Sequence, residues 1–461
     1  MKRFITTLKN IYHIEELRKR ILYTLGIILI YRVGSYIALP GVDVKALAES
    51  GFSSGAREGL LGLLDMFSGG GFSNASIFAL GIMPYISASI VVQLLTLVVP
   101  YFQRLQKEGE SGRKKITQMT RLLTIAVTAL QAPAYIANLI NQTGTSSGVF
   151  HTLTGEVISG GTIPWSFTIV SVIILVSSTL FIMWLGERIT EKGIGNGISL
   201  IIMVGIIARL PFALSAEFVS KVAETGNGGL VTFLIELLLL VGVILITILL
   251  VQGTRKVPVQ YAKRIVGNKQ YGGQRQYLPM KVNAAGVMPI IFAQAIMFLP
   301  LTIMGFATPT EAMSSFAAAM TNNVGFWYNF VFGVLIILFT YFYTAITFNP
   351  QQIAEDMKKN GGFIPGIKPG KKTVEFIDNI ISKITLPGSI FLAFVAIMPA
   401  FARIFGINSQ FAQFFGGTSL LIMVGVVLDT LQQIESHLLM RHYDGLTKSG
   451  RIKGRSPLPI G

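Results

Sequence analysis

The sequence predicts an all-α polytopic membrane protein with ten transmembrane helices. Of its 461 residues, 51% are hydrophobic and only 13% are charged, a balance that is unusual for a soluble globular protein. Ten apolar runs are separated by polar loops, and the positive charges are concentrated in alternate loops. The chain has no cysteine, which excludes a disulfide framework and a thiolate metal site.

The apolar runs have the length of membrane spans, because about 20 helical residues cross roughly 30 Å of hydrocarbon. They cover residues 21–39, 76–99, 121–140, 165–185, 198–212, 230–251, 287–305, 327–348, 386–404 and 413–432. The fifth run has only about 15 residues, with Pro211 near its end. We therefore expect it to be tilted, extended or shielded by its neighbours.

The distribution of charge sets the topology. The loops on one side, together with both chain ends, contain 32 Lys and Arg residues, whereas the loops on the other side contain five. Because positively charged loops remain in the cytoplasm, both termini are expected there, which requires an even number of spans. Residues 1–20 have apolar positions at helical spacing and six basic residues, which predicts an amphipathic helix in the membrane interface. Residues 433–461 are then a cytoplasmic tail.

A short apolar stretch precedes the second run. As a helix, Leu60–Phe67 would be only about 12 Å long, too short to cross the bilayer. The glycine run at 69–71 favours a break, after which Ser73 or Asn74 is expected to cap a long helix from Ile77 to Val99. Membranes tolerate a broken backbone only inside protein or beside a water-filled cavity. The stretch therefore predicts a cavity with a small mobile segment next to it.

Two loops on the positively charged side, 252–283 and 348–385, are long for connectors. In the first, the alternating sequence Val257–Tyr261 predicts a strand of a short hairpin. In the second, Asn349-Pro350 predicts the start of a helix, and Val374–Ile384 a separate amphipathic helix. We interpret both loops as docking arms.

The opposite side carries no large loop. Thr308-Pro309-Thr310-Glu311 has the pattern of a capping box and predicts a short surface helix. The external loop 213–229 separates two sets of five runs. This arrangement is compatible with an internal duplication of inverted topology, which is common in transporters.

Four ionisable residues lie in or beside the apolar runs: Arg32, Asp65, Glu236 and Asp429. Ionisable residues inside a membrane are functional-site hypotheses by default. Each of these, however, is able to pair or to reach the end of its helix, and a proton relay would need several carboxylates at one depth. The chain also has no H-E-x-x-H and no G-x-S-x-G motif, so we expect neither enzymatic activity nor a cofactor.

Five long motifs resemble those of the SecY family, the central subunits of bacterial Sec protein-conducting channels. They are 78–89 (FALGIMPYISAS), 107–113 (KEGESGR), 193–197 (GIGNG), 281–289 (KVNAAGVMP) and 416–419 (GGTS). They occur in the order found in the family and extend from the second run to the tenth. The resemblance implies two pseudo-symmetric halves, 21–212 and 230–432, around a central pore that opens sideways to lipid.

The resemblance also assigns roles to the unusual segments. The stretch 60–72 corresponds to the plug of the pore, with Leu60, Leu61, Leu63, Leu64, Asp65, Met66, Phe67, Gly69, Gly70 and Gly71 as its functional residues. The family's ring of aliphatic pore residues falls on Ile82, Ile86, Ile194, Ile198, Ile291 and Ile422. Spacing alone would place such isoleucines against lipid or a neighbouring helix. The resemblance instead implies a hydrophobic gasket that excludes water and ions.

The long loops correspond to the family's docking sites for the ribosome and for the SecA ATPase. The residues implied are Arg255, Lys256, Tyr261, Lys263, Arg264 and Lys368. Lys368 stands where many relatives have arginine, and lysine keeps the charge but lacks the bidentate fork. Further implied partners are the small membrane subunits SecE and SecG, signal-bearing preproteins, nascent membrane proteins and membrane lipid, all at the bacterial plasma membrane.

Two functions compete on this evidence. A protein-conducting channel, gated by signal sequences and driven by partners, needs no bound ion and needs loops shaped for docking. A secondary transporter with a broken-helix substrate site would place polar ligands near the membrane midplane. This chain has aliphatic residues in the corresponding segments, so we favour the channel.

The charge distribution predicts that the loops 100–115 and 252–281 face the cytoplasm. Protease added to right-side-out vesicles should leave both loops intact, because the membrane shields them. Protease added to inverted vesicles should cleave them. Cleavage in right-side-out vesicles would contradict the predicted topology.

Overall fold

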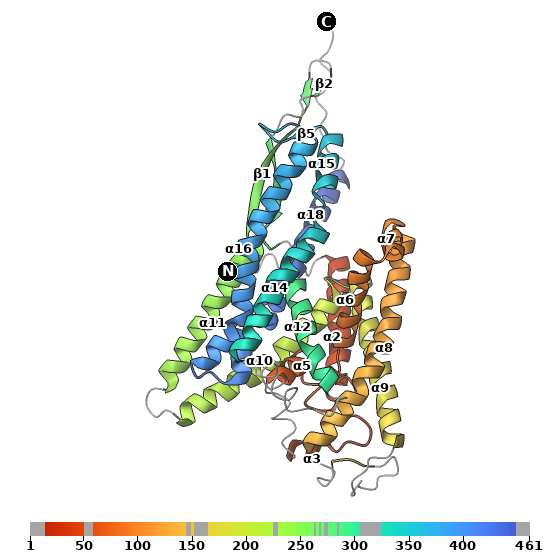
Figure 1. Ribbon diagram of the computed structural model, residues 1–461, viewed down its shortest axis with the longest axis vertical. Coiled ribbons are helices and arrows are strands. Elements are labelled where there is room, and N and C mark those ends of the chain that lie inside the picture. Colours follow the sequence, from red (N-terminus) through yellow and green to blue (C-terminus); the bar gives the residue numbers. More distant parts are fainter. Residues whose placement is uncertain are drawn as a thin grey trace.

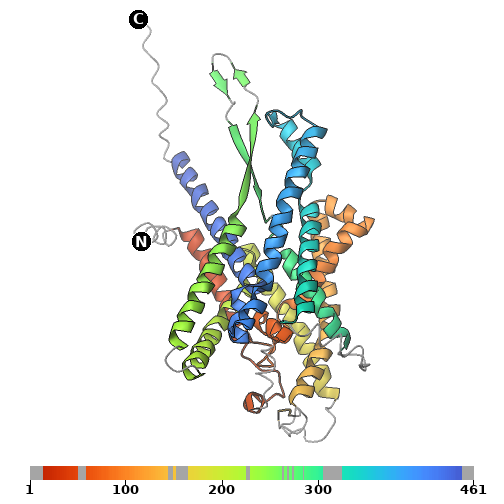
Figure 2. The same ribbon diagram turned by 60° about the vertical axis from the view of Figure 1, so that its left-hand side comes forward.

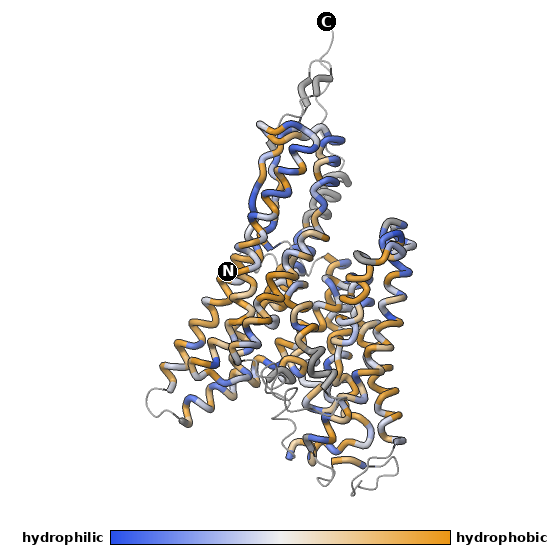
Figure 3. The backbone as a smooth tube through the Cα atoms, viewed as in Figure 1, coloured by the Kyte–Doolittle hydropathy of each residue, from blue (hydrophilic) through white to orange (hydrophobic). Residues whose placement is uncertain are grey.

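The computed structural model consists mainly of long helices, with strands and helix ends that project beyond them at one end (Figures 1 and 2). It describes residues 14–49, 59–143, 149–151, 165–224, 229–261, 264–266, 269–271, 275–283, 285–304 and 324–448. The expected capping box at 308–311 lies outside these residues. Figure 3 shows that apolar residues dominate the helical body, whereas hydrophilic residues gather on the projecting end.

A helix lies on each of the ten apolar runs. These helices are α2 (Glu15–Gly34), α6 (Met83–Val98), α8 (Glu110–Thr143), α9 (Trp165–Lys192), α10 (Gly197–Glu224), α11 (Gly229–Gln252), α12 (Met288–Met304), α14 (Phe326–Thr347), α16 (Lys371–Ile404) and α18 (Gly417–Lys448). In the described part of the chain, seven are long and apolar enough to cross a membrane, and α6 with α7 (Pro100–Lys107), bent by 99°, would make an eighth. The all-α polytopic class is confirmed, and ten spans are consistent with these helices.

The first span begins inside the segment 1–20 that was expected to be an amphipathic helix. Residues 1–13 lie outside the described part, but α2 begins at Glu15 and continues into the apolar run without a break. From Glu15 onward, the expected segment is therefore continuous with the helix of the first span. Ion pairs one helical turn apart, Lys19–Glu15 at 2.9 Å and Arg20–Glu16 at 3.2 Å, favour a helix through this charged segment.

The second span begins later than the sequence suggests. α6 starts at Met83, so the expected helix from Ile77 with its cap at Ser73 or Asn74 is wrong. Gly81 has a φ of +55°, which is incompatible with a right-handed helix, and Pro84 lies in the first turn of α6.

The residues before α6 pair with another segment instead. The Leu39 N–H donates to the Ala75 carbonyl at 2.8 Å, and the Ile77 N–H donates to the Ile37 carbonyl at 2.8 Å. These bonds supply partners that a helix would otherwise have provided. A single bridge between Ala38 and Ser76 completes this pairing.

Two other expected loops are largely helical. α10 continues through Pro211 to Glu224, so most of the expected hinge loop 213–229 belongs to this helix. Membrane helices tolerate proline where neighbouring groups satisfy the freed backbone. α18 likewise continues to Lys448, so the first part of the expected tail 433–461 is helical.

The two long loops form one structure, here called the loop module. It comprises β1 (Thr254–Tyr261), β4 (Arg275–Lys281), α15 (Pro350–Lys359), β5 (Gly362–Phe363) and the first turns of α16, up to Ile384. β1 is the central strand of an antiparallel sheet of order β4-β1-β5, with Thr254 opposite Lys281 and Tyr261 opposite Gly362. β2 (Arg264–Val266) and β3 (Lys269–Tyr271) pair in a second sheet. The predicted hairpin strand is confirmed.

The loop module has its own apolar core. Its buried members come from both loops: Val257, Val259, Met280, Ala354, Met357, Ile364, Ile377, Ile380 and Ile384. The helix predicted to start at Asn349-Pro350 is confirmed, because the Asn349 side chain caps it by accepting from the Gln351 N–H at 3.1 Å. The separate helix expected at 374–384 is instead the start of α16, which continues past Pro387 into the ninth span.

The central core joins the two halves of the chain. Its buried residues come from α2, α5 (Gly59–Phe67), α9 and α10 in the first half, and from α16, α17 (Ser409–Ala412) and α18 in the second. Two further apolar clusters each lie mainly within one half. The interface between the halves is therefore itself an apolar core.

We predict that Ile377→Ala loosens the loop module. Ile377 is fully buried, and removing a buried isoleucine side chain costs about 2–5 kcal/mol. Limited proteolysis of membranes should therefore cut the loops 252–283 and 348–385 faster in this variant. Phe376→Ala is the matched control, because Phe376 is exposed and should leave the cleavage rate unchanged. Equal cleavage in the two variants would contradict the packing described here.

Candidate plug and pore site

α5 is the half-length helix that the sequence predicts. It lies among the spanning helices, away from the loop module (Figure 1). Asp65, Met66 and Phe67 are buried, and Leu63 and Leu64 are half-buried. Met66 and Phe67 belong to the central core, and Leu64 packs against it. The side chains of Leu60 and Leu61 lie outside the described part.

The glycine run that follows α5 forms a compact, hydrogen-bonded turn. Gly69 and Gly70 have φ values of +65° and +96°, a region that favours glycine. The Gly70 N–H donates to the Asp65 carbonyl at 2.8 Å. The Ser68 hydroxyl accepts from the Phe72 N–H at 3.0 Å. The glycines therefore permit a tight reversal that is closely packed in this structure.

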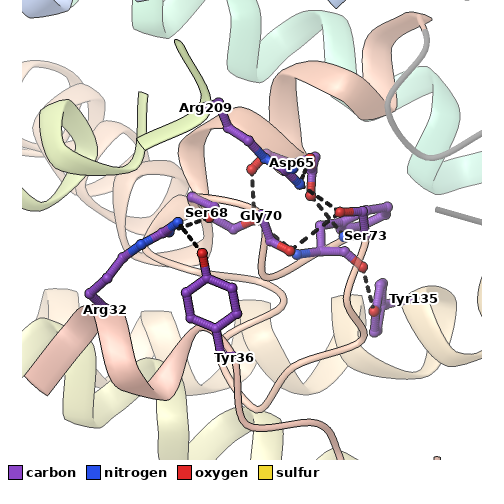
Figure 4. Close-up of polar contacts among 10 residues, drawn as sticks. Arg32, Tyr36, Asp65, Ser68, Gly70, Ser73, Tyr135 and Arg209 are labelled. Carbon is purple, nitrogen blue, oxygen red and sulfur yellow. Dashed lines mark hydrogen bonds and ion pairs between the residues drawn. The ribbon is translucent and has the colours of Figure 1, made fainter. Parts of the chain in front are cut away.

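Arg209 of α10 pairs with the one charged residue of α5. Its guanidinium donates to Oδ2 of Asp65 and, at 2.6 Å, to the Ser73 hydroxyl (Figure 4). Oδ1 of Asp65 accepts from the Ser73 N–H at 2.8 Å. The Asp65 side chain is only 4% exposed and that of Arg209 15%, so the pair is largely shielded from solvent.

Two other side chains hold the turn from different helices. Arg32 of α2 donates to the Gly69 carbonyl at 2.5 Å and to the Tyr36 hydroxyl at 2.7 Å (Figure 4). Tyr135 of α8 donates to the Phe72 carbonyl at 3.0 Å. Three helices therefore contribute polar groups to this short segment.

α10 also approaches the turn closely through Gly205. A Cβ atom at this position would lie 2.9 Å from the Phe67 carbonyl oxygen and 3.1 Å from the Gly69 nitrogen. At Gly70, a Cβ atom would lie 2.8 Å from the Arg209 guanidinium. Glycine at both positions therefore allows the backbone of α10 and the arginine side chain to contact the turn.

The six isoleucines assigned to the ring come from four parts of the chain. Ile82 and Ile422 are buried in the central core, and Ile86, Ile198 and Ile291 pack against it from partly buried positions. Ile194 is buried in the turn before α10, where its N–H donates to the Thr24 hydroxyl at 3.2 Å. Five of the six therefore share the cluster that also holds Met66 and Phe67 of α5.

The loop residues assigned to docking lie on one module. Arg255, Lys256 and Lys368 are exposed, and Tyr261 is half-buried beside β5. Lys263 and the side chain of Arg264 lie outside the described part. The exposed bases Lys358, Lys359, Lys371 and Lys372 on the same module add to its positive surface.

The chain is similar to known proteins over most of its length. The model of the SecY family matches residues 76–431, which is most of the chain. The chain belongs to the SecY family. The protein translocase subunit SecY of Streptomyces coelicolor is 42% identical over 450 residues, which cover 96% of this chain and 100% of the relative. The SecY subunit of Chlamydia trachomatis is 40% identical over 458 residues, with coverage of 98% and 100%.

Solved structures share the SecY-family fold. A structure described as a protein conducting channel has a TM-score of 0.61 at 17% identity, with 95% of each chain covered. Sec61 in a canine ribosome-channel complex has a TM-score of 0.57 at 16% identity, again with 95% of each chain covered. A structure from work on the plug domain of SecY has a TM-score of 0.56 at 17% identity, with 95% of each chain covered.

Three of the four ionisable residues that the sequence analysis named have a polar partner in the structure. Asp65 pairs with Arg209, Arg32 binds the turn, and Glu236 lies 3.2 Å from Lys221. Asp429 is exposed.

Sequence reasoning missed Arg209, because it was counted among the five basic residues on that side and not among the ionisable residues of the fifth run. A search for a cation to match the buried Asp65 would have pointed to the few bases on that side of the membrane.

Proposed function

We propose that this chain is the channel subunit of a protein translocase in the bacterial plasma membrane. The observation that carries the proposal is a half-length helix seated in the apolar core between two helical halves, beside isoleucines from both halves. The named relatives are protein translocase subunits. In this proposal the two halves separate to let a polypeptide cross.

The closed channel is sealed by apolar packing. Ile82, Ile86, Ile194, Ile198, Ile291 and Ile422 form the ring, and α5 with its turn is the plug. A narrow aliphatic constriction dewets and blocks ions, yet its flexible side chains move aside for a peptide. In one related SecY structure, the plug domain is described as stabilising the closed state of the translocation channel and maintaining a membrane seal.

The lateral exit for transmembrane segments lies between α6 and α8 on one side and α12 and α14 on the other. α6 packs against α12, and α12 against α14. The contact between α6 and α12 is the place where the two halves would part towards lipid. A signal sequence that enters there would replace the contacts between α6 and α12 with contacts to its own apolar surface.

The loop module is the docking platform for cytoplasmic partners. Its exposed bases suit an acidic surface, and its sheet and apolar core would present them on a rigid support. Two solved structures with this fold are Sec61 in a canine ribosome-channel complex and a yeast Ssh1 complex bound to the 80S ribosome. We propose the ribosome and the SecA motor as partners here, SecE and SecG as membrane subunits, and both termini on this side.

A secondary transporter is the weaker alternative. Its substrate site would need polar ligands near the membrane midplane. The positions assigned to the ring are isoleucines instead, and five of the six pack in the central core. No feature of the described residues favours an enzyme.

We predict that the ring and the plug both limit ion leakage. Serine at several ring positions would supply hydroxyls that bind water and so weaken the dewetting barrier. Deletion of residues 61–67 removes the plug helix without interrupting a span. Each change should raise the resting conductance of purified channel in planar bilayers, and ring changes should also admit precursors with weakened signal sequences.

Serine at Ile174 or Ile336 is the control for the ring variants, because these isoleucines lie in the clusters of the separate halves. Equal, negligible leakage from ring and control variants would contradict the gasket.

We also predict that Lys368→Glu impairs motor-driven export far more than folding. Lys368 is exposed on a Pro/Gly turn, so the free energy of unfolding should change by no more than about 0.5 kcal/mol. Reversal of its charge should weaken steering and contact with an acidic partner. Export of a signal-bearing precursor into reconstituted vesicles measures the effect. Lys45→Glu, an exposed lysine of α3 (Val44–Glu49), is the control. An unchanged export rate would exclude Lys368 as a docking residue.

A further inference from the structure

We infer that Arg209 is the residue that latches the plug: its ion pair with Asp65 holds α5 against α10 and sets the threshold for opening. This inference rests on the proposed function as a channel. It assigns a role to one arginine of the fifth span and to its partner, and it makes plug release a charge-separation step.

Among the described residues, the ion pair joins the plug helix itself to another helix. Arg32 and Tyr135 bind carbonyls of the following turn, at Gly69 and Phe72. Asp65 is instead part of α5, and its Oδ2 accepts from Arg209. Since the glycine run lies between, the turn can keep its bonds to α2 and α8 while α5 leaves. The bond to α10 must then break, together with the bonds that Asp65 accepts from the Ser73 and Gly70 N–H groups.

Neighbouring residues make room for this ion pair and form hydrogen bonds with it. Gly205 lets α10 approach the Phe67 carbonyl, and Gly70 has no side chain where the guanidinium lies. The Ser73 hydroxyl accepts from Arg209, and the Ser73 N–H donates to Asp65, so both charged groups have further partners. Additional hydrogen bonds of this kind are what makes a shielded ion pair tolerable.

Breaking the pair leaves charges where water is scarce. Asp65 is 4% exposed at its side chain and lies beside Met66 and Phe67 in the apolar core. A shielded charge that loses its partner is far more costly than an exposed one. The plug therefore stays closed until an incoming apolar segment displaces it. Signals that bind weakly would not open the channel, so the pair sets specificity.

The absence of cysteine permits a direct test. Met66→Cys places a single thiol on the plug helix, at a residue that is only 4% exposed in the closed structure. The full chain is reconstituted with its membrane partners in vesicles, and a membrane-impermeant maleimide is added from the side opposite the loop module. The labelling rate reports release of the plug, and planar-bilayer conductance reports the seal.

In the Met66→Cys background, we expect Arg209→Gln and Asp65→Asn each to increase the maleimide labelling rate about tenfold or more over the Met66→Cys parent. Each substitution should also raise the resting conductance. The double variant should be no faster than either single variant, because both remove one shared interaction. Arg209→Lys should stay close to the parent, since it keeps the charge. Fast labelling of the lysine variant, or additive single effects, would overturn the latch.

Two controls separate the latch from other causes. Arg121→Gln removes another arginine pair, with Glu187 between α8 and α9, and should leave both readouts unchanged. If Arg209→Gln does not assemble, Asp65→Asn carries the test without altering α10. Parent-like labelling and conductance in an assembled variant would overturn the latch. If the 61–67 deletion variant conducts ions and the assembled Asp65→Asn variant does not, the latch alone is wrong. If neither variant conducts ions, the proposed plug is wrong too.

Discussion

Inside a membrane, every backbone polar group must find its partner within the protein, and the rest of this structure follows from that constraint. The chain leaves helical geometry between α5 and α6, where the glycine turn and the segment up to Ile82 lie deep in the molecule. The residues after α2 supply backbone partners at Ile37 and Leu39. α2, α8 and α10 supply side chains. A broken helix is thus possible here because other parts of the first half surround it.

In the proposed channel, the site combines two kinds of seal that would respond differently to an entering peptide. Each single contact in the apolar cluster around Ile82 and Ile422 contributes little dispersion energy. The side chains of the cluster can therefore exchange partners as a translocating polypeptide passes. The pair of Asp65 and Arg209 is directional and must be broken as a unit. Apolar packing therefore suits the part that must yield continuously, and charge pairing suits the part that must switch between two positions.

The loop module applies the same physics outside the membrane. Its strand β1 pairs with β4 from its own loop and with β5 from a loop about a hundred residues later in the chain. Residues from both loops, such as Val259 and Ile377, share one apolar core. A partner that binds either loop therefore meets a structure that is continuous with α16, and so with the second half of the channel.

The sequence alone determined the class of protein, the number of apolar runs, the half-length helix at 60–67 and the long basic loops, because these depend on local composition and spacing. It misplaced the start of α6 and the start of the loop after α10, and it did not identify the partner of Asp65. α10 continues through Pro211, Gly81 adopts a positive φ before α6, and Arg209 pairs with Asp65, none of which local sequence patterns indicated. Only the folded chain decides which distant groups satisfy a broken backbone and a buried charge, since both need partners far away in the sequence.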